Sequence, residues 1–241
     1  MKVLRKALRG FRYALFIDLE ATQREAELIE LGAVLAKLDD EGRIAHVYEG
    51  LRTYVKASHS VGPIVRRLTG ISDFDLAKKG IPFEEAIEEL KHYLGKKASE
   101  CIYISYGSND IRILEQSYSF HQEADIHFIR LIKKNYLDFL TFLGRFLHDE
   151  HGNPYSLSNA LKVFGLDFNG QKHDALYDAK ALLELYDAFA HNPPILLEEY
   201  RKNIARGTKL PEPIRQLLDR LMKEGHVDLT DFDETVKEAL E

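Results

Sequence analysis

Apolar runs bounded by turn residues predict the strands of this chain. Residues 13–17 and 28–38 are largely apolar, which is typical of strands buried in a sheet. The segment 39–42, Asp-Asp-Glu-Gly, has the composition of a turn, and 45–55 continues as a third strand. Because short connections join these three strands, we expect an antiparallel meander. Two further strands are predicted at 101–106 and 128–132.

A helical period replaces the strand pattern in much of the remaining chain. Between 82 and 94, apolar residues recur at a spacing of three and four. After the strand at 101–106, Gly107-Ser108-Asn109 turns the chain into a helix that begins at Asp110. Further helices are predicted at 136–147, 157–164 and 175–189. Antiparallel strands followed by alternating helices and strands indicate an α/β protein with a mixed sheet flanked by helices.

The last part of the chain differs from the rest. His191-Asn192-Pro193-Pro194 ends the α/β pattern, and the segment that follows is helical in pattern apart from two prolines and Gly225. We therefore expect one domain over 1–192 and a C-terminal helical appendage over 193–241.

Two carboxylates stand at the end of the first apolar strand. Alternate side chains of a strand share a face, so Asp18 and Glu20 point the same way. Two acids so close repel each other unless a cation or a proton lies between them. The simpler interpretation is a strand that emerges into solvent, and the pair alone favours that interpretation.

A third acid falls on the apolar face of a predicted helix. Asp178 has the spacing of the stripe formed by Ala175, Leu182 and Tyr186, and a charge there is costly unless it is paired or bound to metal. The alternative is a helix start at the edge of the core, where the helix dipole favours an acid. Asp174 can cap this helix, which leaves His173 in the preceding loop, free to turn toward Asp178.

Asp110 completes the set, because it opens a helix directly after a strand, where sites gather in open sheets. A capping role is the ordinary explanation of such an acid. Four carboxylates and one histidine at strand ends and helix starts suit Mg²⁺ or Mn²⁺, since hard oxygen ligands predominate and the single cysteine excludes a Cys-based zinc site. Two such ions can clamp a phosphodiester, with His173 placed to take a proton from water.

Composition narrows the class of protein further. The 241 residues carry a net charge of −6, which argues against a protein that coats duplex nucleic acid. No apolar stretch approaches the roughly 20 residues of a membrane span, and the run behind the basic N-terminus is too short for a signal peptide. We expect a cytoplasmic protein without membrane contact. Cys101 stands in an apolar run and is expected to be a buried hydrophobe.

The segments that contain Asp18, Glu20, Asp110, His173 and Asp178, taken in chain order, resemble the motifs of the DEDDh 3′–5′ exonucleases. These enzymes are also called DnaQ-like and have an RNase H-like fold. The resemblance covers about residues 12–190. Within the family, the Eri1-type exoribonucleases and KapD-like proteins look most similar, although that branch usually has Trp where this chain has Tyr106. The matching segments are DLEAT at 18–22, IELGAV at 29–34, LTGI at 68–71, YGSND at 106–110 and HDALYDA at 173–179.

The resemblance implies a role for each residue. Asp18 would bridge two metal ions, Glu20 and Asp178 would complete the first ion's ligands, and Asp110 would hold the second. His173 would be the general base. The implied substrate is the 3′ end of a single strand, RNA favoured weakly, releasing nucleoside 5′-monophosphates. The expected substrate contacts are the backbone at Ala21 and Thr22, the ring of Tyr106, and Lys172.

Two other functions stay open on the same residues. One is a non-catalytic interaction module, although such a module has no need of an acid on an apolar helix face. The other is a proofreading DNA exonuclease subunit, for which the segment 193–241 would supply a protein partner's binding site.

Overall fold

The computed structural model describes residues 2–149, 151–168, 170, 173–205 and 210–240. Its centre is a six-stranded mixed sheet with the order β3-β2-β1-β5-β6, in which β4 also pairs with β2. The strands β1, β5 and β6 run parallel, whereas β2 is antiparallel to β1, β3 and β4. The strands are β1 (Tyr13–Ala21), β2 (Leu28–Leu38), β3 (Ile44–Val47), β4 (Leu51–Tyr54), β5 (Cys101–Ser105) and β6 (Tyr136–Asp138).

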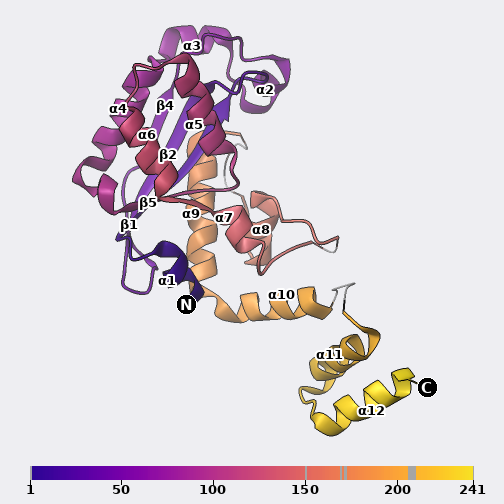
Figure 1. Cartoon of the computed structure of the whole chain (residues 1–241). Helices are drawn as coiled ribbons and strands as arrows, with labels where there is room; N and C mark the ends of the chain where they lie inside the picture. Colours follow the sequence, from indigo (N-terminus) through magenta and orange to yellow (C-terminus); the bar gives the residue numbers. More distant parts are fainter. Residues whose placement is uncertain (1, 150, 169, 171–172, 206–209, 241) are drawn as a thin grey trace.

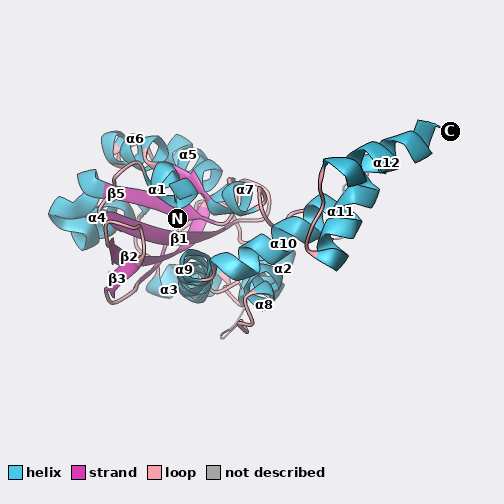
Figure 2. Cartoon of the chain, turned by 90° about the horizontal axis from the view of Figure 1, so that it is seen from below, coloured by secondary structure: helices cyan, strands magenta, loops and turns pink. Residues whose placement is uncertain are grey.

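Helices cover both faces of this sheet (Figures 1 and 2). The first eight are α1 (Lys2–Leu8), α2 (Pro63–Thr69), α3 (Asp73–Lys79), α4 (Phe83–Leu94), α5 (Asn109–Phe120), α6 (Ile126–Lys134), α7 (Phe139–Leu143) and α8 (Leu157–Val163). The last four are α9 (Ala175–His191), α10 (Pro193–Ala205), α11 (Glu212–Glu224) and α12 (Leu229–Leu240). The expected mixed sheet flanked by helices is therefore confirmed.

The alternation of β1 assigns its side chains to two cores. Leu15 and Ile17 pack with α4, α5 and α6, whereas Ala14 and Phe16 pack with α1, α7, α8 and α9. Cys101 of β5 is fully buried in the first of these cores, and burial raises the pKa of its thiol. A third, smaller core joins the edge of the sheet to α2 and α3. The long helix α9 thus lies across the face that carries the even-numbered residues of β1.

The strand predicted at 45–55 is divided into two. β3 pairs with the end of β2 and β4 with its beginning, and the chain leaves the ladder between them. Gly50 lies in this gap, where an added Cβ would be 2.7 Å from the Leu176 side chain of α9. The helix packs against the chain at the point where the ladder is interrupted.

Two predictions near β6 are wrong. Residues 128–132 form part of α6, because Asp125 caps the helix by accepting the backbone N–H groups of His127 at 2.9 Å and Phe128 at 3.1 Å. The helix predicted at 136–147 begins instead with β6, which adds to the parallel edge beside β5. Asp138 then caps α7 by accepting the Thr141 N–H at 3.0 Å. The pattern also gave no warning of α1, α2 and α3.

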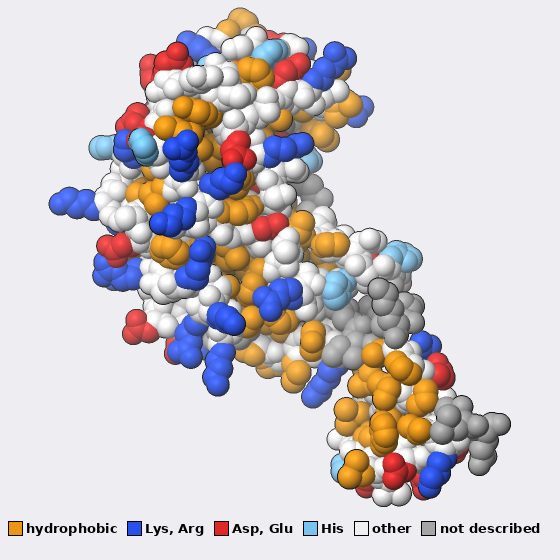
Figure 3. Space-filling model, viewed as in Figure 1, with side chains coloured by type: hydrophobic (Ala, Val, Ile, Leu, Met, Phe, Trp, Pro, Cys, Tyr) orange, Lys and Arg blue, Asp and Glu red, His pale blue; other side chains and the backbone are white. Residues whose placement is uncertain are grey.

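The helices α10, α11 and α12 follow α9 and extend away from the sheet (Figure 1). Apolar side chains gather on the surface of this segment (Figure 3), and those exposed include Leu221, Met222, Leu229 and Phe232. The division at residue 192 stays a prediction. No helix among the described residues is long and apolar enough to cross a membrane.

Candidate active site

Asp18 and Glu20 lie in the second half of β1, on the face of the sheet that α9 covers. Ala14 and Phe16 pack in the core beneath α9, and strand alternation continues that face through the two acids. Pairing of β5 with β1 ends at Phe16 and Ile104. The two acids therefore lie beyond the last pair of the β1–β5 ladder, while β1 still pairs with β2 at both positions.

Asp110 reaches the same place from the neighbouring strand. β5 ends at Ser105, and the turn at 106–108 leads directly into α5. Asp110, in the first turn of α5, is 6% exposed, and its Oδ1 accepts the Leu19 backbone N–H at 2.9 Å. This hydrogen bond ties the acid to β1 at the residue between the two acids of that strand.

The loop before α9 and the first turn of this helix bring His173 and Asp178 close to the acids of β1. The Asp174 side chain caps the helix by accepting the Tyr177 N–H at 3.2 Å, which leaves His173 in the preceding loop. His173 has a left-handed φ of 61°, and its backbone N–H donates to Asp178 Oδ2 at 3.0 Å. Its ring Nδ1 lies 3.6 Å from Glu20 Oε1. The loop thus turns the histidine back toward both acids.

Gly32 allows α9 to approach the sheet this closely. It pairs with Asp18 across the β1–β2 ladder, and a Cβ atom there would lie 2.1 Å from the Ala175 carbonyl carbon. Any larger residue would push the start of α9 away from β2. The glycine therefore sets the distance between Asp178 and the acids of β1.

An ion-pair network with one fully buried acid holds the start of α9 from the sheet side. Glu30 of β2 is 1% exposed, and it accepts Arg52 Nε at 2.6 Å and the Ala175 N–H at 3.2 Å. Arg52 of β4 also pairs with Asp174, the cap of α9. The sequence prediction missed Glu30 and Arg52 as site residues. The available signal was a glutamate in the middle of an apolar strand, which is costly unless a partner is present.

The four acids have unusually high pKa values. Burial raises the pKa of Glu20 to about 8, and the nearby charges of Asp178 and Glu30 add to the effect. Burial also raises the pKa of Asp110 and of Asp178 to about 6 in each case. The pKa of Asp18 lies well above its usual range because of burial and the charges of Asp110 and Asp178. The carboxylates repel one another, and a cation would remove the repulsion.

These side chains face one open cleft of about 420 Å³. Within the described part of the chain, Glu20, His173 and Asp178 each offer a ligand atom, all within 4.8 Å of one another. Carboxylate oxygens with one imidazole fit a hard divalent cation. The cleft is lined by Asp18, Leu19, Glu20, Tyr106, Asn109, Asp110, Ser156, Leu157, Ser158, His173 and Asp178.

The expected substrate contacts have different positions. Tyr106 lines the cleft, and its hydroxyl donates to the Tyr155 carbonyl at 2.6 Å. Ala21 ends β1, and Thr22 is buried, with its Oγ1 accepting the Glu27 N–H at 3.0 Å. Lys172 lies outside the described residues. The substrate roles of these residues stay predictions.

Comparison with known proteins identifies the family. The sequence model of a family described as exonuclease matches residues 15–186. The chain belongs to this exonuclease family. The expected relation to the DEDDh, DnaQ-like exonucleases with an RNase H-like fold is confirmed, and so is the expected hydrolase class. No curated protein sequence matches the chain.

Solved structures share the fold at low sequence identity. The nuclease domain of 3′hExo, a DEDDh family member bound to rAMP, matches with a TM-score of 0.61 and 19% identity over 76% of this chain and 94% of that one. A full-length 3′-exonuclease matches with a TM-score of 0.60 and 18% identity over 76% of this chain. E. coli Exonuclease I with a dT13 oligonucleotide matches with a TM-score of 0.57 and 17% identity over 77% of this chain.

The matched chains differ in length from this one. The chain spans 61% of the full-length 3′-exonuclease and 42% of E. coli Exonuclease I. The shared part is therefore the nuclease fold that carries the acidic cleft.

Proposed function

We propose that the protein is a metal-dependent 3′–5′ exonuclease that shortens single-stranded nucleic acid and releases nucleoside 5′-monophosphates. One observation carries the proposal: Asp18, Glu20, Asp110 and Asp178 come from β1, α5 and α9 and converge in one cleft that has no Lys or Arg among its described lining residues. Their raised pKa values support the proposal, because bound cations would neutralise the charges that repel one another there.

Two Mg²⁺ or Mn²⁺ ions fit this donor set. Asp18 would contact both ions, Glu20 and Asp178 would complete the ligands of one, and Asp110 would hold the other. Bound there, the ions would supply charge neutralisation for the scissile phosphate and its leaving oxygen. The Arg52–Glu30 network and Gly32 hold the start of α9, which carries Asp178, against β2.

His173 is suited to the role of general base. Its side chain is exposed at the rim of the cleft, and its ring nitrogen lies 3.6 Å from Glu20. The backbone bond to Asp178 holds the residue in place while its ring stays open to water. A neutral imidazole in this position would take a proton from an attacking water molecule.

RNA is the substrate that we favour. Support comes from the fold shared with 3′hExo, whose nuclease domain was solved with rAMP, and with a 3′-exonuclease that recognises a histone mRNA stem-loop. Exonuclease I, with its dT13 oligonucleotide, keeps DNA as the second candidate. Discrimination requires a contact to the 2′-hydroxyl.

The test is a gel assay on 5′-labelled single-stranded RNA and DNA of equal sequence, with Mg²⁺, Mn²⁺ or EDTA. We expect a metal-dependent ladder that shortens from the 3′ end, faster on RNA. His173→Ala should reduce the rate by about 10²–10⁴-fold. Cleavage of neither strand in either metal would contradict the proposal and favour an interaction module or a nuclease that needs a partner on 193–241.

A further inference from the structure

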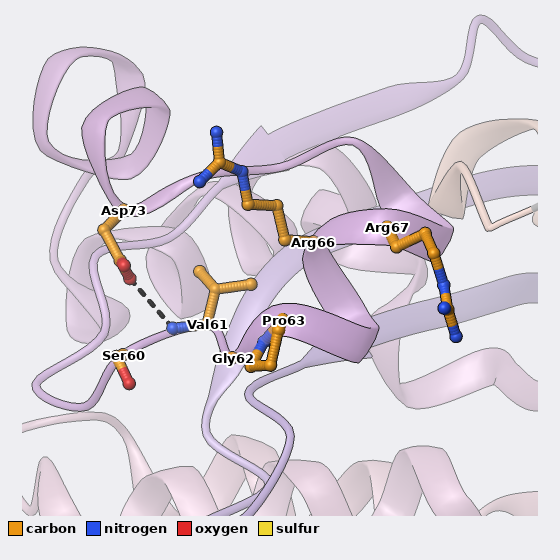
Figure 4. A pocket seen from close by; sticks show the side chains of 7 residues that line it. All are labelled: Ser60, Val61, Gly62, Pro63, Arg66, Arg67 and Asp73. Carbon is orange, nitrogen blue, oxygen red and sulfur yellow. Dashed lines mark hydrogen bonds between the residues drawn. The ribbon is translucent and has the colours of Figure 1, made fainter.

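A second hollow lies beside the end of β1, outside the acidic cleft. It has a volume of about 530 Å³, and it is formed by the loop before α2, by α2 itself and by the first residue of α3 (Figure 4). A smaller hollow of about 370 Å³ adjoins it and shares Ser60, Gly62 and Pro63 with it. The first is lined by Ser60, Val61, Gly62, Pro63, Arg66, Arg67 and Asp73.

Three arginines line these two hollows: Arg24, Arg66 and Arg67. All three are exposed, and none forms an ion pair with another described residue. Two acids, Glu25 and Asp73, line the hollows as well, and Asp73 Oδ1 accepts the Val61 N–H at 2.8 Å. In Figure 4 the side chains of Arg66 and Arg67 extend to different sides of α2, so they reach separate points on a ligand.

Hydrogen bonds join this surface to the chain just after β1. The Gln23 N–H donates to the Val61 carbonyl at 3.0 Å, and Gln23 Oε1 accepts the Ile64 N–H at 3.0 Å. Gln23 is three residues beyond Glu20, so their Cα atoms are at most about 11 Å apart. The arginine-lined surface is thus held close to the cleft by the chain that leaves it.

An exposed aromatic residue follows Asp73, the last residue of the hollow's lining, in the chain. This residue, Phe74, lies in the first turn of α3, and it is 73% exposed. Among the described residues it is the most exposed Phe or Tyr, since the others that are exposed reach 39–43%. Basic residues together with exposed aromatic rings are the combination that holds single strands, since the former contact phosphates and the latter stack on bases.

The charge of the cleft gives a reason for a second contact surface. No Lys or Arg occurs among the described residues that line the cleft, and its acids repel phosphates other than those neutralised by metal ions. A strand longer than the terminal nucleotide therefore needs positive charge elsewhere.

We propose that Arg66, Arg67 and Phe74 form a subsite for the single strand upstream of the scissile phosphate. The arginines contact its phosphates, and Phe74 stacks on one base. This subsite rests on the proposed exonuclease function. It would make the affinity for a substrate depend on the length of the strand upstream of the cleft.

The direct test is equilibrium binding of a 5′-fluorescein-labelled 20-nucleotide single strand, RNA or DNA, measured by anisotropy with EDTA present so that nothing is cleaved. The variant is Arg66→Ala/Arg67→Ala. The matched control, Arg130→Ala/Lys134→Ala, removes two exposed positive charges from α6. Both pairs lie in helices, where alanine is favourable, so folding is retained.

We expect about tenfold weaker binding by the α2 variant and no change in the control. The slope of log K against log salt should become less negative by about 1.4, because two phosphate contacts are lost. Phe74→Ala should also weaken binding about tenfold while leaving the salt slope unchanged, and Phe74→Tyr should restore it. Unchanged affinity and slope in the α2 variant overturn the subsite, and unchanged affinity of Phe74→Ala overturns the stacking contact.

Kinetics then separate the subsite from the catalytic cleft. Hydrolysis of the p-nitrophenyl ester of a nucleoside 5′-monophosphate, which has no upstream strand, should proceed equally in wild type and the α2 variant, while KM for the 20-nucleotide strand rises about tenfold. A wild type that binds the strand through these residues but cleaves nothing with Mg²⁺ or Mn²⁺ contradicts the exonuclease proposal and leaves the subsite standing.

Discussion

Glu27 and the acids of the cleft are carboxylates in opposite surroundings. Glu27, just before β2, is 1% exposed and accepts the N–H groups of Ser58 at 2.7 Å and His59 at 3.0 Å. Its oxygens also lie 2.9 Å from His59 Nδ1 and 2.7 Å from His121 Nε2. We call this the Glu27 node. In the cleft, Glu20 has the His173 ring nitrogen 3.6 Å away and the negative charges of Asp178 and Glu30 nearby.

The difference shows in the direction of the pKa shifts. Burial alone would raise the pKa of Glu27, but the donors from Ser58, His121 and His59 outweigh it and lower the pKa. Burial raises the pKa of Glu20 to about 8, and neighbouring acids push it in the same direction. A buried acid that accepts several hydrogen bonds stabilises the fold. Buried acids that lie beside other acids repel one another, and a bound cation would relieve this repulsion.

The largest expected effect comes from removing one acid of the cleft. Asp18→Asn should lower kcat by at least about 10³-fold, because charge stabilisation by bound metal is worth several kcal/mol. Since the substitution also removes repulsion, the melting temperature of the metal-free protein should stay equal or rise. Single-turnover cleavage and calorimetry measure the two effects. An active variant, or one that melts much lower, would remove Asp18 from the proposed role.

The opposite result is expected in the Glu27 node. Glu27→Gln weakens several charge-assisted hydrogen bonds at once, which should cost about 3 kcal/mol of unfolding free energy. The melting temperature should fall by about 6–12 °C, while the folded fraction keeps its response to Mg²⁺. Thermal melts with and without metal make the comparison. Full stability in this variant would show that the node is not structural.

The metal-free protein should lose stability as pH rises. In the folded state the pKa is about 8 for Glu20 and about 6 for Asp110 and Asp178. These three acids therefore keep their protons at pH values where the unfolded chain has already released them. Because the folded state then binds more protons, stability is highest below about pH 4–5 for these groups and falls through pH 6–8.

Melting temperatures between pH 5.5 and 8.5 in EDTA test this linkage. The Glu27 node has the opposite sign, since its lowered pKa contributes stability above about pH 4.5 that is lost only in acid. Mg²⁺ should stabilise the protein more at pH 8 than at pH 6, because it competes with protons for the same oxygens. A metal-free protein whose stability rises steadily from pH 6 to pH 8 would contradict the cleft acids' raised pKa values.

The smallest expected effect on stability comes from changing one histidine of the Glu27 node. His121→Gln replaces the imidazole donor to Glu27 with a neutral amide and removes the ring contact with Phe83, whose centroid is 5.8 Å away. We expect a loss of about 1 kcal/mol, or about 2–4 °C in melting temperature, with activity unchanged. Denaturant titration measures it. A loss of activity at constant stability would indicate that the node communicates with the cleft.

Local patterns predicted well where one element determines its own structure. The bounds of β2 and the starts of α8 and α9 follow from apolar period and caps, and so does the place of His173 in a loop. The same reasoning failed at 128–132 and 136–147. There, the cap at Asp125 and a short edge strand beside β5 decided between helix and strand. A three-residue strand has too few residues to display a period.

The sequence by itself determined which residues are candidates for the chemistry of this protein: four acids and a histidine at strand ends and helix starts, all within residues 15–186 that match the exonuclease family. It did so because alternation, helical period and capping are local rules. Only the tertiary structure decided how near these groups lie. Contacts between elements far apart in the chain create the close approach of α9 at Gly32, the Arg52–Glu30 network and the arginine-lined surface at α2. No single segment contains the information that sets those distances.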